Sequence, residues 1–293
     1  MAPYTTEVGG AVCNIAIEMH ATATLTPSAR PVAPDQPLVL AAWDRAGRPA
    51  VAVELQSDIP IGSGLGGSSA AGVALAAAFA AWRGERLAPA ALAELSRVTE
   101  TESMGLAGGC QDHYAAAFGG ALLLSCRAVT TPAAIPLSAA TIAEFERRTL
   151  VAFTGESRMS ANTITAVLDA YRAGEKQTCR SLQRMAELAP MMARVLADGD
   201  IDALGGLLSE QWAAQRALHS TISTPLIDRI VADCGDAGAL GTKALGASGG
   251  GCVLVIASAD RVDAVRAALS RHATILPLRV ARHGVQIHTT AAD

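Results

Sequence analysis

The stretch that decides the fold is Asp58-Ile59-Pro60-Ile61-Gly62-Ser63-Gly64-Leu65-Gly66-Gly67-Ser68-Ser69-Ala70-Ala71-Gly72. Four glycines fall within six residues, and two serines stand where an alanine-rich run begins. Glycine allows positive φ angles and lets backbone N–H groups approach a ligand closely. The start of a helix adds unpaired N–H donors and a partial positive charge, which suit a phosphate. The stretch therefore predicts either a phosphate-binding loop or a tight strand-to-helix turn capped by Ser68 or Ser69.

Two common nucleotide-binding motifs do not explain this stretch. Residues 62–67 formally satisfy the dinucleotide pattern G-x-G-x-x-G, but that pattern needs a second strand ending in an acid about twenty residues further on. The nearest acid, Glu85, follows Trp82-Arg83-Gly84, which is typical of a helix end and not of a strand. A Walker loop needs Gly-Lys-Ser or Gly-Lys-Thr, and no lysine occurs here.

Length and composition limit the function classes. A chain of 293 residues suits two domains or one large one, and its composition (51% apolar, 3% aromatic) predicts an aliphatic core. The net charge is −4 without a basic stripe, which argues against nucleic-acid binding. The most apolar run, residues 70–82, is shorter than the roughly twenty residues of a membrane span, and no signal segment precedes it. We therefore expect a soluble, cytoplasmic protein that binds neither nucleic acid nor membrane. The six cysteines show no disulfide or zinc spacing.

The hydrophobic patterns predict an α+β chain with a soft boundary near residue 148. The first part has expected strands over 11–25, 38–43, 50–56 and 121–125, and helices over 68–82 and 88–103. The second part has an expected strand over 150–153, helices over 160–173, 175–197, 201–219, 225–234 and 260–271, and strands over 252–256, 275–280 and 285–289.

A second candidate stretch is Gly108-Gly109-Cys110-Gln111-Asp112-His113-Tyr114-Ala115-Ala116-Ala117-Phe118-Gly119-Gly120. An acid beside glycines at a helix start is often only a cap. The functional alternative is that the Asp112 carboxylate orients or deprotonates an attacking hydroxyl, as phosphoryl transfer requires. His113 is a competing base. Because neighbouring residues on a helix point in different directions, we expect only one of the two to face the site.

Two further sets of residues have both a structural and a functional interpretation. Glu100 and Glu102 precede Asp112 at the end of an expected helix, where acids are usually solvated but could also bind Mg²⁺. Gly241-Thr242-Lys243-Ala244-Leu245-Gly246-Ala247-Ser248-Gly249-Gly250-Gly251-Cys252 has four glycines in six residues. It is either a loop before a strand or a segment that shapes a cleft, because ordering so many glycines costs backbone entropy.

Taken together, these three stretches resemble the motifs of the galactokinase, homoserine kinase, mevalonate kinase and phosphomevalonate kinase superfamily, the GHMP kinases. The first stretch resembles Pro-x-x-x-Gly-Leu-Gly-Ser-Ser-Ala, with Gly67 in place of the first Ser. The second resembles Gly-x-Gln-Asp-x-Tyr-Ala-Ala-x-Phe-Gly-Gly of the heptose 7-phosphate kinases and fucose kinases. The third resembles Lys-x-x-Gly-Ala-Gly-Gly-Gly-Gly, with Ser248 in place of one glycine.

The resemblance implies a two-domain GHMP kinase fold, with a ribosomal S5 domain 2-like domain over 1–148 and a ferredoxin-like domain over 149–293. It implies Mg²⁺ at Ser68 and Glu100, with Glu102 left open as the alternative ligand, and Asp112 as the catalytic aspartate. Expected substrate contacts are Gln111, Gly249, Gly250 and Arg158, the last within a Phe-Thr-Gly-x-Ser-Arg element. The residues expected to bind ATP are Pro60, Gly62, Ser63, Gly64, Leu65, Gly66, Gly67, Ser68 and Ser69.

The expected reaction is ATP-dependent phosphorylation of a sugar or sugar phosphate, with the anomeric hydroxyl of D-glycero-D-manno-heptose 7-phosphate as the leading acceptor. Fucose, another hexose or a cyclitol phosphate is the alternative acceptor, and a non-catalytic nucleotide-binding protein is the alternative class. The family's opening strand, with its arginine and Gly-Gly-x-(Thr/Ser)-Asp, has no match before Pro3-Tyr4, so we expect a truncated start. The sequence determines no oligomeric state, and a homodimer is the assembly considered.

Overall fold

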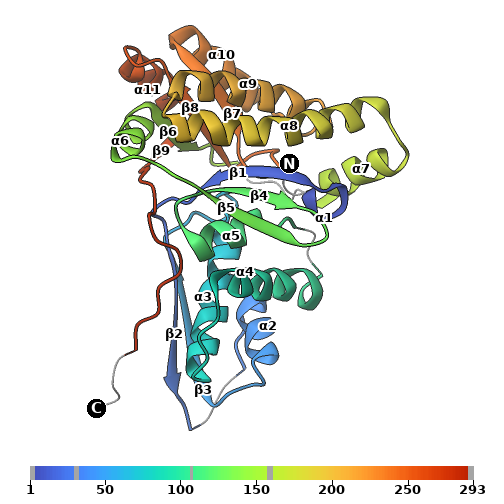
Figure 1. Cartoon of the computed structure of the whole chain (residues 1–293), viewed down its shortest axis with the longest axis vertical. Helices are drawn as coiled ribbons and strands as arrows, with labels where there is room; N and C mark the ends of the chain where they lie inside the picture. Colours follow the sequence, from blue (N-terminus) through green and yellow to red (C-terminus); the bar gives the residue numbers. More distant parts are fainter. Residues whose placement is uncertain (1–3, 30–32, 106–107, 157–160, 290–293) are drawn as a thin grey trace.

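The computed structural model describes residues 4–29, 33–105, 108–156 and 161–289. Helices and antiparallel strands are mixed along the chain, which confirms the predicted α+β class (Figure 1). The strands are β1 (Gly10–Ile15), β2 (Ala21–Pro27), β3 (Val51–Ser57), β4 (Ala121–Cys126), β5 (Thr130–Ile135), β6 (Thr149–Phe153), β7 (Ala239–Ala244), β8 (Cys252–Ala257) and β9 (Thr274–Leu276). The helices are α1 (Thr5–Val8), α2 (Pro37–Arg45), α3 (Gly67–Trp82), α4 (Pro89–Val98), the π-helix η1 (Thr99–Ser103), α5 (Gln111–Phe118), α6 (Ala139–Arg148), α7 (Ala161–Arg172), α8 (Lys176–Asp198), α9 (Ile201–Arg216), α10 (Pro225–Ala237) and α11 (Val262–Ser270).

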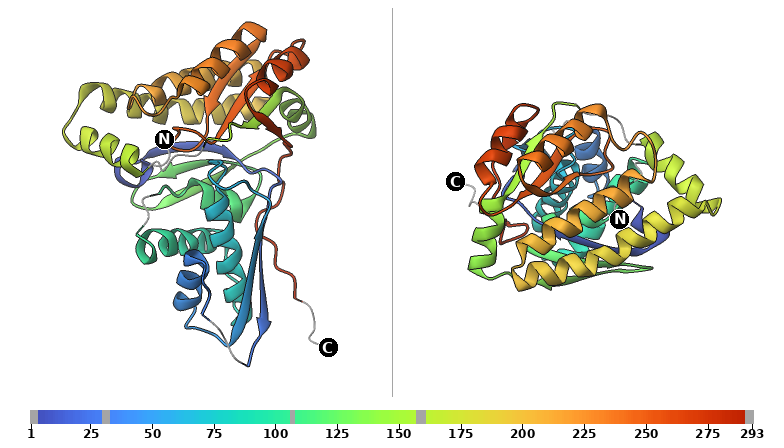
Figure 2. Two further views of the ribbon diagram at one scale, coloured as in Figure 1. Left: turned by 180° about the vertical axis from the view of Figure 1, so that it is seen from behind. Right: turned by 90° about the horizontal axis from the view of Figure 1, so that it is seen from above.

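The strands of the described residues form three sheets. One sheet has the order β1-β4-β5, a second is the pair β2-β3, and the third has the order β7-β8-β6-β9. Every pairing is antiparallel, and β1 is in register with β4 from Gly10 opposite Cys126 to Ile15 opposite Ala121. The molecule is elongated, with the β6–β9 sheet and α8–α11 at one end, the β1-β4-β5 sheet in the middle and the β2-β3 ribbon at the other end (Figures 1 and 2).

The middle sheet packs against the end of the molecule that carries α8–α11. Helix α8 packs against β1, and α9 packs against β7. Buried residues of the middle sheet and of that end form one hydrophobic cluster there, including Ala121, Leu196, Leu204 and Ile256. The core is aliphatic, as the composition predicts. This packing brings the start of α3, the start of α5 and the end of β7 around one region.

Helix α3 begins directly after the glycine-rich loop. Its sequence is almost entirely apolar, so it is buried on several sides and packs against α2, α4, α5 and β2. Gly72 allows close packing of α4, because a Cβ on Gly72 would lie 2.2 Å from Ser96 Oγ. These contacts fix the direction in which the first turn of α3 points.

Two predicted strands in the first part of the chain are wrong. Residues 38–43 lie in α2, where Pro37 occupies the first turn and Val39, Ala42 and Trp43 form one buried face. That spacing of three and four residues is the helical period, which the short apolar run also fits. The expected strand over 11–25 is two strands, β1 and β2, separated by residues 16–20.

Other elements differ in extent from the sequence-based expectation. The expected helix over 88–103 ends as α4 at Val98 and continues as η1, and residues 130–135, for which no element is predicted, form β5. The strand expected over 275–280 is limited to β9 plus an isolated bridge between Val280 and Ile17. Residues 285–289 form no strand, which contradicts the prediction. The domain boundary at 148/149 remains a prediction. Within the described ranges, no helix is both long enough and apolar enough to cross a membrane.

Candidate active site

The glycine-rich loop adopts a backbone that only glycine accepts easily. Gly62, Gly64 and Gly66 all have positive φ, between 71° and 76°. Gly66 is the N-cap of α3, and its carbonyl accepts the first helical hydrogen bond from the Ala70 N–H at 2.9 Å. The predicted serine cap is not used, since no side chain caps α3. The first-turn N–H groups of α3 therefore have no side-chain partner at the cap.

The third glycine-rich stretch lies directly against this loop. The Cys252 N–H donates to the Ser63 carbonyl at 2.7 Å, and a Cβ on Gly251 would lie 2.8 Å from the same carbonyl oxygen. Gly64 and Gly246 also touch, because a Cβ on Gly246 would lie 3.3 Å from Gly64 Cα. These glycines shape the cleft by letting two backbones approach, as the sequence suggests.

Asp112 lies in the first turn of α5, against the start of α3. A Cβ on Gly66 would lie 2.8 Å from the Asp112 Cβ and 3.0 Å from its Cγ. One oxygen of the carboxylate, Oδ2, accepts a hydrogen bond from Gln111 Nε2 at 3.0 Å. Burial raises the pKa of Asp112 above its ordinary value, and the nearby Glu100 carboxylate adds to this, against the opposing effects of His113 and Gln111. The carboxyl group therefore stands next to the glycine-rich loop with a strengthened affinity for a proton.

Ser68 and Glu100 form a direct contact. Ser68 Oγ donates to Glu100 Oε1, and His113 Nε2 lies 3.0 Å from Glu100 Oε2. Burial raises the pKa of Glu100, but the hydrogen bonds from His113 and Ser68 outweigh it and hold the pKa below its ordinary value. Glu102, the alternative ligand, is largely exposed and lies 3.6 Å from Arg45. The structure thus brings together an ionised carboxylate and a hydroxyl beside the loop, while Glu102 points elsewhere.

This pair fits Mg²⁺. Hard cations take oxygen ligands, and Mg²⁺ usually keeps several waters and binds through one or two protein oxygens plus phosphate oxygens. No group of three His, Cys, Asp or Glu side chains among the described residues could enclose a metal ion. A site made of Glu100, Ser68 and nucleotide phosphates needs no such group.

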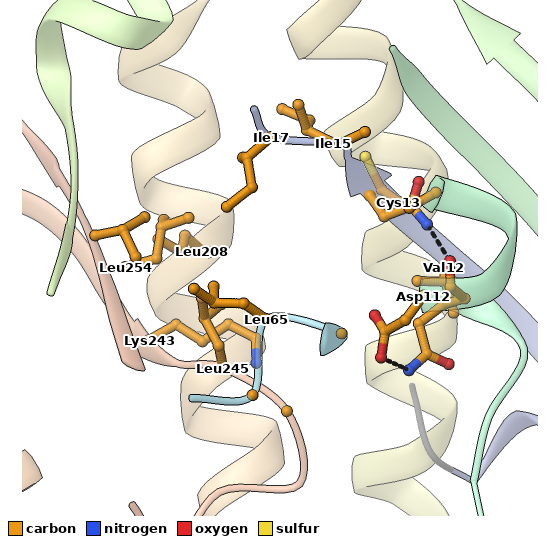
Figure 3. Close-up of a pocket in the computed structure, with 18 of the residues that line it drawn as sticks. Val12, Cys13, Ile15, Ile17, Leu65, Asp112, Leu208, Lys243, Leu245 and Leu254 are labelled. Atoms are coloured by element: carbon orange, nitrogen blue, oxygen red, sulfur yellow. Dashed lines mark hydrogen bonds between the residues drawn. The ribbon is translucent and has the colours of Figure 1, made fainter. Parts of the chain in front are cut away.

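A cavity of about 340 Å³ opens beside Asp112, with β1, the glycine-rich loop and α5 on one side and α8, α9, β7 and β8 on the other. In Figure 3, Asp112 lies on one side of this cavity and Lys243 on the other, with Leu65 of the glycine-rich loop between them. Most of the lining side chains are aliphatic. Its polar lining residues are Asn14, Gln111, Asp112, Gln211, Gln215 and Lys243.

Lys243 lies on β7 and its ammonium group is held by neutral acceptors. Nζ donates to Gln215 Oε1 and to the Ala244 carbonyl, the latter at 2.9 Å. Burial lowers the pKa of Lys243 to about 7. The sequence patterns assign no role to Lys243, Gln211 or Gln215. The one local sequence signal for this group is the position of Lys243 at the start of the third motif. Gln211 and Gln215 join this group through the contact between α9 and β7, which is long-range and leaves no local pattern.

The structure places the predicted substrate contacts in different surroundings. Gln111 lines the cavity. Gly250 instead supports the segment after β6, since its Cβ would lie 2.6 Å from the Glu156 carbonyl, and the Gly249 N–H donates to the Ile222 carbonyl at 3.0 Å. Ser248, which replaces a glycine of the motif, has a positive φ of 71° and donates to the same Ile222 carbonyl. Arg158 lies outside the described residues.

Two family models match the chain. The N-terminal domain model of the GHMP kinases matches residues 37–120, and the C-terminal model of the same family matches residues 192–274. The match to the first model spans both the glycine-rich loop and Asp112, and the match to the second spans the third glycine-rich stretch.

Curated relatives and solved structures agree with these models. The D-glycero-alpha-D-manno-heptose 7-phosphate kinase of Campylobacter jejuni is 32% identical over 202 residues, which cover 67% of this chain and 58% of that protein. The bifunctional fucokinase/GDP-fucose pyrophosphorylase of Arabidopsis thaliana is 28% identical over 76% of this chain and 21% of that protein. The chain thus spans little more than half of the first relative and a fifth of the second. A crystal structure of a D-glycero-D-manno-heptose 1-phosphate kinase from Bacteroides thetaiotaomicron superimposes with a TM-score of 0.72 at 20% identity, covering 98% of this chain and 94% of that one.

Proposed function

Since the chain belongs to the GHMP kinase family, we propose that it transfers the terminal phosphoryl group of ATP to a hydroxyl of a sugar or sugar phosphate. The observation that carries this proposal is the contact between Asp112 and Gly66. It puts a carboxylate beside the loop whose N–H groups would bind the phosphates, which is where an acceptor hydroxyl must be held for in-line attack. The domain division at residues 148 and 149 belongs to the same proposal.

In this mechanism ATP lies along the loop from Pro60 to Ser69. The Asp112 carboxylate accepts the proton of the acceptor hydroxyl. The hydroxyl oxygen bonds to the γ-phosphorus of ATP, and the bond from that phosphorus to the bridging oxygen breaks, which releases ADP. The raised pKa of Asp112 makes it a better proton acceptor at neutral pH. Ser68 and Glu100 would hold Mg²⁺, which when bound neutralises phosphate charge. Alignment of the reactants supplies most of the remaining rate enhancement.

The leading acceptor is the anomeric hydroxyl of D-glycero-D-manno-heptose 7-phosphate, supported by the similarity to the Campylobacter jejuni enzyme. Fucose, another hexose or a cyclitol phosphate is the alternative acceptor. Gln111 lines the cavity beside Asp112 and is the proposed sugar contact. Gly249, Gly250 and Arg158 stay substrate contacts that the family resemblance predicts.

A second candidate is a non-catalytic nucleotide-binding protein of the same fold. The observation that favours it is the cavity itself, whose lining is mostly aliphatic and poorly complementary to a polyol. Both candidates predict ATP binding, but only the first predicts turnover.

The test is ADP release by the 293-residue chain with Mg²⁺ and ATP across heptose 7-phosphate, fucose, other hexoses and cyclitol phosphates, with phosphorus NMR of the product to locate the phosphate. Calorimetric titration with ATP runs in parallel. Acceptor-dependent ADP release supports the kinase. ATP binding without turnover on any acceptor selects the non-catalytic alternative, and failure to bind ATP rejects both.

A further inference from the structure

His113 follows Asp112 in the sequence but faces a different set of side chains. Its ring is 1% exposed, and its two nitrogens have different partners. Nε2 lies 3.0 Å from Glu100 Oε2 and 3.4 Å from Ser69 Oγ, while Nδ1 lies 2.9 Å from Ser96 Oγ. His113 therefore connects η1, the start of α3 and the end of α4.

The donor and acceptor roles follow from the chemistry of these partners. The Glu100 carboxylate is ionised and can only accept, so Nε2 must carry a hydrogen and donate to it. Ser96 can bond to Nδ1 whether or not Nδ1 carries a hydrogen. Its hydroxyl donates to a bare Nδ1; if Nδ1 carries a hydrogen, the hydroxyl accepts from it and donates to the Ser69 carbonyl at 3.4 Å. The result is a continuous chain of contacts from Ser96 through His113 and Glu100 to Ser68.

The local packing holds His113 in this position. Gly72 has no Cβ, which leaves room for Ser96 Oγ against α3. Thr99 Oγ1 bonds to the Leu95 carbonyl at 2.8 Å, within the turn where α4 passes into η1. A π-turn at this point adds an extra residue to the helix and changes the direction of the side chains that follow. Glu100 lies in η1, so the direction of its carboxylate is set by a short irregular element. A hydrogen-bond partner outside η1 is therefore needed to hold the carboxylate in one orientation.

We propose that His113 is a positioning residue, which fixes the Glu100 carboxylate in the orientation needed for the Mg²⁺–nucleotide complex. The role rests on the proposed function, because Glu100 and Ser68 are metal ligands only if a nucleotide binds there. His113 itself touches neither substrate nor metal in this arrangement. Hydrogen-bond partners of metal-ligating carboxylates typically change metal affinity by about 10-fold to 100-fold when removed.

A purely structural role would have a different signature. If His113 only fills space in the core, its loss would weaken the binding of free ATP and of the metal–ATP complex together, in proportion to misfolding. A positioning role weakens metal–ATP binding selectively. Since Glu100 retains its bond from Ser68 in either case, the selective loss should be partial and not complete.

The experiment measures two dissociation constants on the full chain, with Mn²⁺ as the spectroscopic substitute for Mg²⁺. Electron paramagnetic resonance reports Mn²⁺–ATP binding, and calorimetry in a chelator reports metal-free ATP binding. The variants are His113→Leu, which removes the donor, and His113→Gln, whose amide N–H can still donate. Tyr114→Phe is the matched control, since Tyr114 is also buried on α5 but its hydroxyl bonds to Glu94 at 2.9 Å, away from Glu100.

We expect His113→Leu to raise the Mn²⁺–ATP dissociation constant about 10-fold and the metal-free ATP constant less than 2-fold, with His113→Gln recovering most of the loss. Equal weakening of both constants, or no recovery by glutamine, would overturn the proposal for His113. If His113→Leu does not fold, Ser96→Ala removes the partner of His113 Nδ1 instead. A Mn²⁺–ATP constant that is unchanged in Ser96→Ala, or raised as much in the control Tyr114→Phe, would also contradict the proposal. Failure of the unmutated chain to bind Mn²⁺–ATP would reject the proposed function instead.

Discussion

The two sides of the cavity beside Asp112 are built differently. On the side of the glycine-rich loop, the polar groups bond to each other: Ser68 to Glu100, Glu100 to His113 and His113 to Ser96. On the side that faces the other end of the molecule, α8, α9 and β8 present aliphatic side chains around Gln211, Gln215 and Lys243. The first side is held in place by the protein alone, as a preorganised charge-binding site requires.

Three buried polar atoms of the cavity lining accept no hydrogen bond from the described residues: Gln211 Oε1 on α9, and Asn14 Oδ1 and Gln111 Oε1 on β1 and α5 beside Asp112. An unpaired buried acceptor costs about 1–3 kcal/mol, which a ligand hydroxyl could recover by donating to it. The comparison suggests that the nucleotide side is formed before binding, whereas the acceptor side is completed by its ligand.

Among the variants that test this comparison, we expect Asp112→Asn to have the largest effect, a loss of turnover. The amide keeps the shape but cannot accept the proton of the acceptor hydroxyl, so turnover should fall about 1,000-fold, within the usual range for a general base. ATP affinity should stay within about 3-fold, because the loop amides are unchanged. Steady-state rates and calorimetry on the same preparation check both values. An equal loss of turnover and ATP affinity would instead indicate a structural role for Asp112.

A substitution at Gly66 should disrupt the glycine-rich loop on its side of the cavity. In Gly66→Ala, the new Cβ would lie 2.8 Å from Asp112 Cβ at a φ of 76°, so the loop or α5 must shift. We expect ATP affinity to fall at least 10-fold, measured by calorimetry. The matched control is Gly84→Ala, where φ is 73° but nothing lies within 4 Å. Both variants pay the left-handed backbone cost of about 1–2 kcal/mol, so equal ATP affinities in the two would refute the special role of the Gly66 contact.

On the acceptor side, Gln211→Leu should act on the acceptor alone. Removing an unpaired buried oxygen should leave the free energy of unfolding unchanged or slightly higher, while the KM of the acceptor rises about 5-fold to 10-fold through one lost hydrogen bond. The KM of ATP should not change. Leu208→Met, one turn earlier on α9 and also lining the cavity, is the control that keeps the volume and alters no polar atom. A shift in the KM of ATP, or the same acceptor KM in both variants, would place Gln211 outside the acceptor site.

Sequence reasoning located the loop side better than the acceptor side, for a physical reason. Glycines at positive φ and a carboxylate at a helix start leave local signals, so the stretches around Gly66 and Asp112 could be recognised. The resemblance to the heptose kinase pattern favoured Glu100 over Glu102. Gln215 and Lys243 meet only because α9 packs on β7, and no local pattern records such a long-range contact. A short apolar run is also ambiguous between strand and helix, which explains the wrong prediction for residues 38–43. In the structure these residues lie in α2, where Val39, Ala42 and Trp43 form one buried face.

The smallest effect concerns Lys243 and the stability of the acceptor side. Burial lowers its pKa from 10.5 to about 7, so between these values the unfolded chain holds a proton that the folded chain has lost. The free energy of unfolding contributed by this group therefore rises with pH across that window, and the full penalty is present below pH 7. Lys243→Met removes the penalty but also the hydrogen bonds to Gln215 and Ala244, so we expect a net gain of about 1–2 kcal/mol near pH 6.

That gain corresponds to a Tm increase of about 2–6 °C for a chain of this size. It should shrink as the pH rises and become a net loss as the pH approaches 10, because the penalty has then gone while the lost hydrogen bonds remain. Differential scanning calorimetry of both proteins at pH 6, 8 and 10 measures it. Lys243→Gln is the matched control, since it also removes the charge but keeps a hydrogen-bond donor for Gln215. A gain that does not depend on pH would mean that Lys243 has the same pKa in the folded and unfolded states and is well solvated in both, and the contrast between the loop side and the acceptor side would then not extend to β7.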